Sequence, residues 1–345
     1  MNNFSFFNFW RFLFKKPKVV MVWGNGKEIT FDIIEKVLGK KRDILVEKID
    51  FKKEKKVEKF VSLSQLPILI LTHIGEIPHD KDFFAGEREK TKEIRKYAKK
   101  LPPFGYLILN YDDETIREIR DETNLREITF GFANLADFKA TDIKINSGTN
   151  FKLNFENKIL PIWLENLFGK EYIFAVLATC ALCKVLNLNL IEITQSLKGY
   201  KGRPGKMRLI CGIKNSKIFD NSKIEGIFSI MEALEIFKKI SLFKRKIAVL
   251  GDIVGLGKYT IEIHQMLGEK LKECCDLLFT FGQRAKFVAK GAFEKGLPLE
   301  KIFQFDTIKE GIEKLKNEIR ENDLILVLGS KEMKMESVVE KIKLK

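Results

Sequence analysis

The feature that most constrains the fold is a unit that recurs along the chain. Each unit is a short apolar run, followed by a turn rich in glycine or polar residues and then by a helical pattern. The apolar runs read "VVMVW", "PILIL", "GYLILN", "RKIAVLG", "DLLFTFG" and "NDLILVLG". Strands that alternate with helices in this way predict an α/β protein with mostly parallel, doubly wound sheets, which bind ligands at the carboxyl ends of their strands.

Two stretches interrupt this alternation and divide the chain. Residues 122–160 alternate in shorter steps, as in "REITFGF" and "FKLNFENKIL", and predict β-strands added at an edge of the first sheet. After an apolar helix near residues 175–186, the glycine-rich and basic stretch "GYKGRPGKMR" marks a domain boundary. We therefore expect an N-terminal segment at residues 1–16, a central domain at 17–203 and a Rossmann-like C-terminal domain at 204–345.

The N-terminal segment is aromatic and basic. Seven aromatic residues lie between positions 4 and 14, and a cluster of lysines follows them. The segment is shorter than the ~20 apolar residues needed to cross a bilayer. Two alternatives stay open: it lies in a membrane interface with its lysines toward anionic lipid, or it covers a hydrophobic patch of the protein itself.

Charge and cysteine content narrow the class of partners and the compartment. The formal net charge of +15 favours anionic partners, namely nucleotides, nucleic acid or an anionic membrane, although lysines mixed with glutamates are also typical of a solvated surface. The five cysteines are odd in number and lack secretory spacing, which indicates reduced thiols in a cytoplasm. Cys180 and Cys183 have the spacing of a zinc or redox half-site, but they lie in an apolar helical run, so we interpret them as packing residues.

The first apolar run leads into a candidate phosphate-binding loop. Gly24, Asn25, Gly26 and Lys27 separate the run from the next helical pattern. The backbone N–H groups of such a loop cradle phosphates, and its lysine contacts the transferred group. The loop is one residue short, and Glu28 stands where a hydroxyl normally ligates magnesium. A carboxylate there repels phosphate, so a loop that binds ATP weakly and a vestigial loop are both open interpretations.

The second half carries the most distinctive motif. The stretch "KRKIAVLGDIVGLGKYTIEIHQMLGEKL" resembles the C-terminal domain of the Mur ligase family, in particular its MurF type, which adds D-alanyl-D-alanine to a peptidoglycan precursor. The residues in register are Gly251, Asp252, Leu256, Gly257, Tyr259, Thr260, His264 and Gly268. The first half resembles the family's central ATPase domain more loosely, through "LTHIGEIPHDKDFFAGERE" and "GYLILNYDDE". The family's N-terminal uridine-nucleotide domain is expected to be missing.

The resemblance implies an ATP-dependent ligase that joins a carboxylate to an amine through an acyl phosphate. It implies ATP and Mg²⁺ as cofactors, and a UDP-linked muramoyl peptide and a D-amino-acid dipeptide as substrates. The expected location is the cytoplasm, with contact to the inner face of the membrane through the N-terminal segment as an option. A second hypothesis is a non-catalytic paralogue that keeps the fold for binding or regulation, because the phosphate loop is altered. A nucleic-acid binder rests on charge alone, and we expect no nucleic-acid partner.

The resemblance also assigns roles to single residues outside the loop. Glu47 aligns with a metal-binding glutamate, and His79 with a metal-associated histidine that we include in the catalytic set. Asn110 aligns with an asparagine near the adenine. Lys206 stands where the family has an arginine that contacts the nucleotide. Asp220 survives from a nucleotide-binding motif whose tyrosine and asparagine are replaced here.

One lysine is expected to be chemically modified. In this family a lysine carbamylated by CO₂ gives magnesium a carboxylate, and the matching stretch offers Lys90 and Lys92. Helical spacing places Lys90 on one face with Ile94, Tyr97 and Leu101, whereas Lys92 falls on a charged stripe. Lys90 is therefore predicted to face inward and to be the catalytic, metal-binding lysine.

Overall fold

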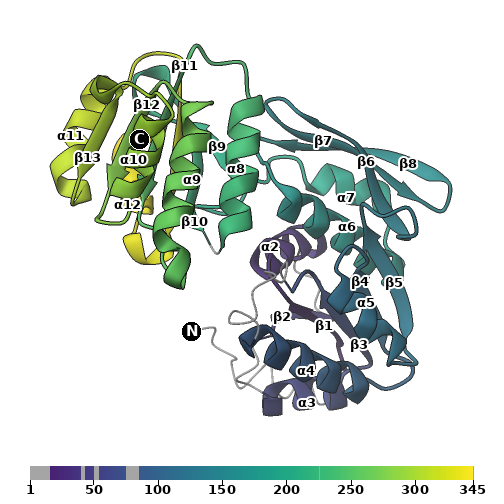
Figure 1. The fold of residues 1–345 in the computed structure, drawn as a ribbon. Coiled ribbons are helices and arrows are strands. Elements are labelled where there is room, and N and C mark those ends of the chain that lie inside the picture. Colours follow the sequence, from purple (N-terminus) through teal and green to yellow (C-terminus); the bar gives the residue numbers. More distant parts are fainter. Residues whose placement is uncertain (1–15, 40–42, 50–53, 75–84, 225, 345) are drawn as a thin grey trace, which may run out of the picture. The chain divides into compact units, whose positions relative to one another are not determined.

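The chain folds into two compact units (Figure 1). The computed structural model describes residues 16–39, 43–49, 54–74, 85–224 and 226–344, and the side chains of residues 54–56, 85–91 and 93 also lie outside the description. Unit 1 comprises Met1–Ile143, Asn150–Trp163 and Lys170–Tyr200, and unit 2 comprises Lys144–Thr149, Leu164–Gly169 and Lys201–Lys345. The domain boundary expected at residue 203 stays a prediction, because the two compact units are each made of several segments. Within the described residues, no helix is long and apolar enough to cross a membrane.

Unit 1 is built on a mostly parallel sheet with the strand order β2-β1-β3-β4-β5-β6-β7-β8. Strands β1 to β5 pair in parallel with their neighbours in this order, and β6 continues in parallel from β5. The bounds are β1 Lys18–Trp23, β2 Ile44–Lys48, β3 Leu66–Leu71, β4 Tyr106–Asn110 and β5 Arg126–Gly131. Their apolar runs are continuous rather than alternating, because helices cover both faces and bury every side chain of β1, β3 and β4 after the first residue of each strand.

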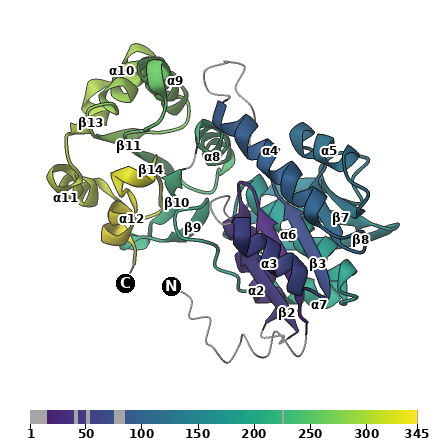
Figure 2. The ribbon, with the colours of Figure 1, turned by 90° about the horizontal axis from the view of Figure 1, so that it is seen from below.

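Helices pack on both faces of this sheet (Figures 1 and 2). Helices α3, α4 and α5 share a core with strand residues such as Met21, and α2 packs against α6 on the other face. The bounds are α2 Lys27–Leu38, α3 Glu54–Leu63, α4 Ala85–Lys100, α5 Glu114–Asp121, α6 Lys170–Val185 and α7 Leu190–Ser196. Helix α6 is apolar all round, as expected of a helix buried on every side. Cys180 and Cys183 are fully buried inside it, which confirms that they are packing residues, and burial raises the pKa of Cys180.

The short-period stretch forms strands at the end of the sheet, as predicted. Strands β6 (Phe138–Ile145), β7 (Gly148–Phe155) and β8 (Lys158–Glu165) are joined by two-residue connections, so they run antiparallel to one another. In the second connection Glu156 and Asn157 both have positive φ, the conformation of a tight hairpin turn. Strand β5, which the pattern assigned to the same edge addition, instead pairs in parallel with β4 and belongs to the central sheet.

Unit 2 is a doubly wound sheet with the order β13-β12-β11-β14-β10-β9. All pairs are parallel except β9 with β10. Helices α8, α9 and α10 share a core on one face, and α11 and α12 share one on the other. The strand bounds are β9 Arg208–Cys211, β10 Lys217–Ile224, β11 Arg245–Gly251, β12 Leu277–Phe281, β13 Ile302–Phe305 and β14 Asp323–Ser330. The helix bounds are α8 Ile227–Lys239, α9 Thr260–Lys272, α10 Lys286–Glu294, α11 Ile308–Glu318 and α12 Glu336–Ile342, with short 3₁₀ turns at Ile213–Asn215, Gly257–Tyr259, Leu299–Lys301 and Lys331–Met333.

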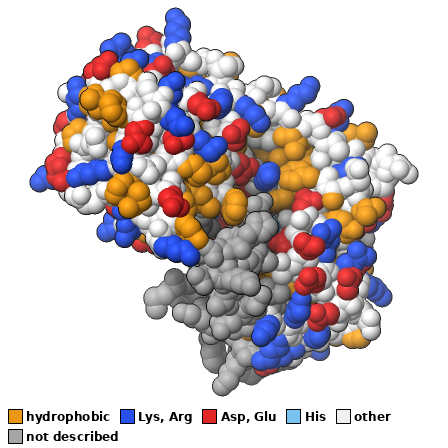
Figure 3. Space-filling view, in the orientation of Figure 1, with side chains coloured by type: hydrophobic (Ala, Val, Ile, Leu, Met, Phe, Trp, Pro, Cys, Tyr) orange, Lys and Arg blue, Asp and Glu red, His pale blue; other side chains and the backbone are white. Residues whose placement is uncertain are grey.

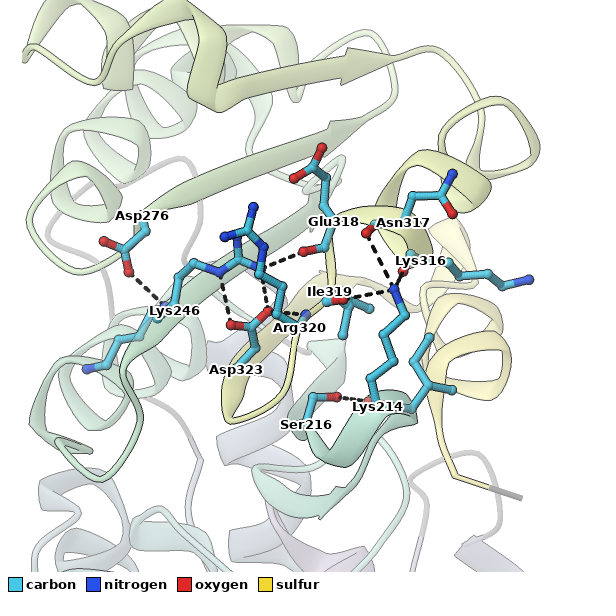
Figure 4. A network of polar contacts seen from close by, with 12 residues as sticks. Lys214, Ser216, Lys246, Asp276, Lys316, Asn317, Glu318, Ile319, Arg320 and Asp323 are labelled. Atoms are coloured by element: carbon cyan, nitrogen blue, oxygen red, sulfur yellow. Dashed lines mark hydrogen bonds and ion pairs between the residues drawn. The ribbon is translucent and has the colours of Figure 1, made fainter.

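A polar network closes the amino-terminal edge of the unit 2 sheet (Figure 4). Arg245 binds both carboxylate oxygens of Asp323, at 2.9 Å from Nε and 2.6 Å from Nη2, and Nη2 also donates to the carbonyl oxygen of Glu318. This bidentate contact raises the pKa of Arg245, chiefly through the hydrogen bonds to Asp323. Nearby, the Nζ atom of Lys214 caps the carboxyl end of α11 by donating to the carbonyl oxygens of Lys316, Asn317 and Ile319. The network joins elements that are distant in sequence.

The observed architecture, two largely parallel sheets with helices on both faces, confirms the predicted α/β class.

The surface charge is mixed. On the face shown in Figure 3, lysine and arginine side chains lie among aspartates and glutamates. Much of the positive charge on that face is therefore locally balanced.

Candidate functional site

The candidate phosphate loop lies between β1 and α2, at the carboxyl end of the parallel strands of unit 1. Its glycines adopt backbone conformations that other residues rarely reach, with φ of +113° at Gly24 and +77° at Gly26. A Cβ at Gly24 would lie 2.4 Å from Thr72 Oγ1 and 2.7 Å from the carbonyl oxygen of His73, so this position has no room for a side chain. Gly26 leads directly into α2, a helix of 12 residues whose amino end favours anions.

The loop is clamped to the end of the neighbouring strand β3. The backbone N–H of Asn25 donates to the carbonyl oxygen of His73 at 2.6 Å, and its side-chain amide donates to the carbonyl oxygen of Ile74 at 3.2 Å. The hydroxyl of Thr72 lies 3.0 Å and 2.6 Å from the carbonyl oxygens of Trp23 and Asn25, with which it hydrogen-bonds. Thr72 and His73 were not among the predicted site residues, although they directly follow the run "PILIL" and so lie at the end of a strand.

Lys27 is the first residue of α2, and its Nζ donates to the carbonyl oxygen of Ile49 at 3.2 Å. Ile49 follows β2, so Lys27 lies across the ends of the strands beside the loop. Thr30 carries the hydroxyl nearest to the loop on the C-terminal side, but it is buried and donates to the carbonyl oxygen of Gly26 at 3.1 Å. This hydroxyl serves the helix backbone and does not replace the hydroxyl that the loop lacks at position 28.

Carboxylates border the loop on two sides. Glu28 forms an ion pair with Lys48 of β2, with 2.6 Å between Oε2 and Nζ, and each side chain is 32% exposed. The same Nζ lies 4.8 Å from the centre of the Phe31 ring, so Lys48 contacts two residues of α2. On the other side, a Cβ at Gly26 would lie 3.6 to 3.7 Å from side-chain carbons of Glu171, at the start of α6. The electrostatics of the loop therefore depend on which of these charges are neutralised.

Asn110 lies at the carboxyl end of β4 and is fully buried. Its Oδ1 accepts a hydrogen bond from the backbone N–H of Asp112 at 3.0 Å, whereas its Nδ2 has no acceptor among the described residues. The carboxylate of Asp112 accepts from the backbone N–H groups of Phe132 and Ala133, which ties β4 to the end of β5. A buried amide donor left unpaired costs about 1–3 kcal/mol, so a ligand that accepts from Asn110 would recover that cost.

Asp113 links the same edge to the loop clamp. Its carboxylate accepts from the backbone N–H of Ile74 at 2.7 Å and, as the N-cap of α5, from that of Ile116 at 3.2 Å. His73 Nδ1 lies 2.9 Å from Oδ2 of Asp113. Burial by itself would raise the pKa of Asp113, but the hydrogen bonds from His73 and the two N–H groups outweigh it and lower the pKa below 3.8. The end of β3 is thus held by an ionised carboxylate.

Only part of the predicted metal site lies within the described residues. Glu47 lies in β2, and strand alternation places it on the side of Leu45, which packs into the core shared with α4. His79 lies outside the described residues. Within the described part of the chain, no group of three or more His, Cys, Asp or Glu residues could hold a metal ion. The assignment of Glu47 and His79 to magnesium stays a prediction.

Lys90 belongs to α4, on the sheet face where Glu47 also lies, but its side chain is outside the description. The residues predicted to share its helix face are buried: Ile94 is 2% exposed, Tyr97 5% and Leu101 7%. Lys92 is exposed, as predicted for the charged stripe. The inward face of α4 is therefore where the helical spacing placed it, and the carbamylated role of Lys90 stays a prediction.

The nucleotide-binding residues predicted in the second half lie in unit 2. Asp220 is 1% exposed, and its carboxylate accepts from the backbone N–H of Gly205 at 2.8 Å, from Arg208 Nε at 3.1 Å and from the hydroxyl of Ser222 at 2.7 Å. Gly205 has a φ of +82°, and Lys206, which follows it in the turn, is buried. Asp220 therefore builds the turn that carries Lys206, while the contact of either residue with a nucleotide stays a prediction.

Asp252 and His264, two residues of the Mur ligase-like motif, bind backbone groups near the carboxyl end of β11. Asp252 accepts hydrogen bonds from two consecutive backbone N–H groups just before α10, at 2.9 and 2.8 Å. His264 of α9 is fully buried; its Nε2 accepts from the backbone N–H of Ile253 at 3.2 Å, and its Nδ1 lies 2.6 Å from the carbonyl oxygen of Thr260. Burial lowers the pKa of His264, so the ring is neutral and accepts through Nε2. These residues shape the edge of the unit 2 sheet.

The residues of the loop fit a polyphosphate. Gly24 is a position that a Cβ would overfill, Lys27 supplies a positive charge at the amino end of α2, and the buried amide of Asn110 offers a donor at the same strand edge. Of the three predicted magnesium ligands, only the side chain of Glu47 belongs to the described part of the chain.

Comparison with known proteins shows that the chain is similar to Mur ligases. Residues 227–331 match the family model "Mur ligase, glutamate ligase domain". The UDP-N-acetylmuramate–L-alanine ligase of Dictyoglomus turgidum is 28% identical over 280 residues, which cover 76% of this chain and 58% of that protein. The UDP-N-acetylmuramoyl-tripeptide–D-alanyl-D-alanine ligase of Bacillus subtilis is 23% identical over 354 residues, which cover 93% of this chain and 75% of that protein. The chain thus spans little more than half of the first relative.

Solved structures share the fold across both units. MurF of Acinetobacter baumannii superposes with a TM-score of 0.81 at 19% identity, over 96% of this chain and 78% of that one. MurF ligase of Thermotoga maritima in complex with ADP superposes with a TM-score of 0.72 at 17% identity, over 94% of this chain and 79% of that one. The chain has the fold of the Mur ligases, and residues 227–331 are similar to the Mur ligase glutamate ligase domain. The MurF type is not singled out, because alanine-adding and D-alanyl-D-alanine-adding relatives both match.

Proposed function

We propose that the chain is an ATP-dependent ligase that joins a carboxylate of a muramoyl peptide precursor to the amine of an amino acid or dipeptide. The observation that carries the proposal is the loop at residues 24–27, which has no space for a side chain at Gly24 and places Lys27 at the amino end of α2. The Mur ligase domain at residues 227–331 and the named ligases among the relatives support the reaction class.

The reaction asks the protein mainly to position groups and to neutralise charge. ATP supplies the phosphoryl group that activates the carboxylate, and the amine then displaces phosphate to form the amide. On this chain, the Lys27 side chain and the loop N–H groups other than those of Asn25 and Lys27, which donate to His73 and Gly24, bind the polyphosphate. Asn110 is assigned to the adenine, with its buried Nδ2 as the donor. Thr72 and Asp113 keep the loop clamped to the strand ends, so its donors are in place before a nucleotide arrives.

Several finer assignments belong to the same proposal. The amine substrate is the D-amino-acid dipeptide implied by the MurF resemblance, and the carboxylate is carried on a UDP-linked muramoyl peptide. The relatives whose names specify such substrates support this choice. Mg²⁺, held by Glu47, His79 and carbamylated Lys90 at a site separate from the residue 28 position of the loop, completes the cofactor set. The protein works in the cytoplasm. Its aromatic N-terminal segment, which lies outside the described residues, either contacts the inner face of the membrane or covers a hydrophobic patch of the protein.

The first test is nucleotide binding by the purified chain, measured by calorimetry with ATP and ADP. Lys27→Ala is expected to weaken binding by about tenfold or more, because a positive charge at the helix amino end is lost. Lys36→Ala is the matched control: Lys36 lies in the last turn of the same helix and is exposed. Equal affinities of these two variants would remove Lys27 from the site.

The second test is phosphate release with UDP-muramoyl peptides, offered with D-alanyl-D-alanine, L-alanine or other amino acids. Release that depends on both the peptide and the amine supports the ligase, and the preferred amine identifies the type. A folded chain that binds ATP but releases no phosphate with any pair would contradict the ligase proposal.

A non-catalytic paralogue is the second candidate, and a specific observation favours it. The loop carries Glu28 and is bordered by Glu171, and the hydroxyl of Thr30 is turned onto the helix backbone. A loop with these carboxylates holds phosphate less well than one with a free hydroxyl. Absence of any nucleotide affinity in the calorimetric test would favour this candidate.

A further inference from the structure

The pair formed by Glu28 and Lys48 is the feature of the loop that the proposed function leaves unexplained. In phosphate loops of the common type, the residue after the lysine gives a hydroxyl to Mg²⁺, and the ion neutralises the phosphates beside it. Here that residue is Glu28, and the cation at its carboxylate is the Lys48 ammonium at 2.6 Å. A single positive charge thus lies at this position on a side chain, where a magnesium ion would bring two.

The position of Lys48 is fixed by contacts on two sides. Strand β2 pairs in parallel with β1, and this register sets Lys48 opposite Val22, two residues before the loop. Its ammonium is held by Glu28 and lies 4.8 Å from the centre of the Phe31 ring, one turn further along α2. A cation that contacts both a carboxylate and an aromatic face loses little freedom on binding a ligand. Lys48 is therefore preorganised at the amino end of α2.

No other group takes over the loop-side metal role in the described part of the chain. The hydroxyl of Thr30 is buried and donates to the Gly26 carbonyl oxygen. Glu47 is next to Lys48 in sequence, but strand alternation points it to the opposite face of β2. The described residues also contain no group of three or more acidic, histidine or cysteine residues suited to a metal ion.

We propose that Lys48 replaces the loop-bound divalent cation, so that the chain binds the polyphosphate of a nucleotide at this loop without magnesium. This inference rests on the proposed function, since it assumes that the loop binds a nucleotide. Glu28 acts as the positioning residue: it holds the Lys48 ammonium where the phosphates arrive and is itself neutralised by it. Lys27 and Lys48 then give the loop two positive charges, which offset the negative charges of Glu28 and of Glu171 beside Gly26.

The test compares nucleotide affinity in excess magnesium with affinity in EDTA, using ATP and ADP and calorimetry. For the unaltered chain, the two affinities are expected to differ by less than about threefold. Lys48→Met is expected to lose about tenfold or more in EDTA and to regain part of it with magnesium, because Glu28 is then a bare carboxylate. Lys48→Arg keeps the charge and is expected to behave as the unaltered chain does.

The double variant Glu28→Thr with Lys48→Met is the sharpest arm, because it keeps the net charge of the loop and returns the hydroxyl. It is expected to bind in magnesium and to lose about tenfold or more in EDTA. Lys314→Met is the matched control in unit 2: Lys314 pairs with Glu318 at 2.7 Å and lies 5.0 Å from the centre of the Phe303 ring. It is expected to leave both affinities unchanged.

The outcomes separate the inference from the proposed function. If the unaltered chain binds tightly in magnesium, loses about tenfold in EDTA, and shares this ratio with Lys48→Met, the inference is overturned and the ligase proposal stands. If the unaltered chain binds no nucleotide in either condition, the proposed function falls and the inference falls with it. Circular dichroism of each variant, with Lys48→Gln as a second substitution, shows that a loss of binding is not a loss of folding.

Discussion

Replacing Gly24 by alanine should destabilise unit 1 far more than the same change at another glycine of positive φ. The new Cβ would lie 2.4 Å from Thr72 Oγ1, 2.7 Å from the His73 carbonyl oxygen and 2.8 Å from the His73 nitrogen. Thr72 cannot turn away cheaply, because its hydroxyl binds the carbonyl oxygens of Trp23 and Asn25. Backbone strain, overpacking and the lost hydrogen bond together cost about 3–5 kcal/mol.

Gly199→Ala is the matched control for this prediction. Gly199 has a φ of +71° and belongs to unit 1, but a Cβ there would meet nothing within 4 Å. It should cost only the left-handed backbone strain, about 1–2 kcal/mol. Urea denaturation followed by circular dichroism measures the difference between the two variants, and calorimetry with ATP measures the loop. If Gly24→Ala unfolds within about 1 kcal/mol of Gly199→Ala, the reasoning that the loop is clamped against β3 is refuted.

Three further changes test other parts of the structure. Burial lowers the pKa of His264 from 6.5, so below pH 6.5 the unfolded chain binds a proton that the folded chain does not bind, and the free energy of unfolding falls. His264→Gln should flatten this pH dependence when denaturation is measured at and below pH 6.5. Arg245→Met strands the buried Asp323 carboxylate and should cost about 3 kcal/mol in the same assay, whereas a cost near zero would show the pair to be unimportant. Asp220→Asn removes the charge that holds the turn and should cost about 1–2 kcal/mol, with faster hydrogen exchange at the Gly205 N–H as the direct measurement.

The strands and their polar ends could be predicted from the sequence because the signal is local. An apolar run followed by a glycine or polar turn marks both a buried strand and its carboxyl end, and β1, β3 and β4 end where these turns begin. The inward face of α4 was predictable for the same reason, since a 3.6-residue period puts Ile94 and Tyr97 on one side. The parallel placement of β5 was not, because its short alternating pattern fits an added edge strand equally well.

The sequence allowed a site residue to be predicted only where its role depends on that residue and its neighbours in the chain, not on a partner distant in sequence. Gly24 and Lys27 are recognisable from their order in the chain. The partner of Glu28 is 20 residues away and becomes its neighbour only because β2 pairs with β1 in one particular register. Asp220 shows the opposite case. The family resemblance suggested a contact with the nucleotide, and the structure shows its carboxylate bound to the backbone of Gly205 and the side chains of Arg208 and Ser222.

These two cases change how the altered loop is interpreted. Taken alone, Glu28 opposes phosphate binding, and a sequence comparison counts it as a lost function. Taken with Lys48, it is one half of a neutral pair placed at the amino end of a helix, beside Lys27 and the glycines of the shortened loop. Gly24, at a φ of +113°, is required by the clamp to Thr72 whether or not the loop binds a ligand. The neutralised charge of Glu28 is therefore the feature that favours a loop that still binds an anion, with its countercharge moved from a metal ion to a side chain.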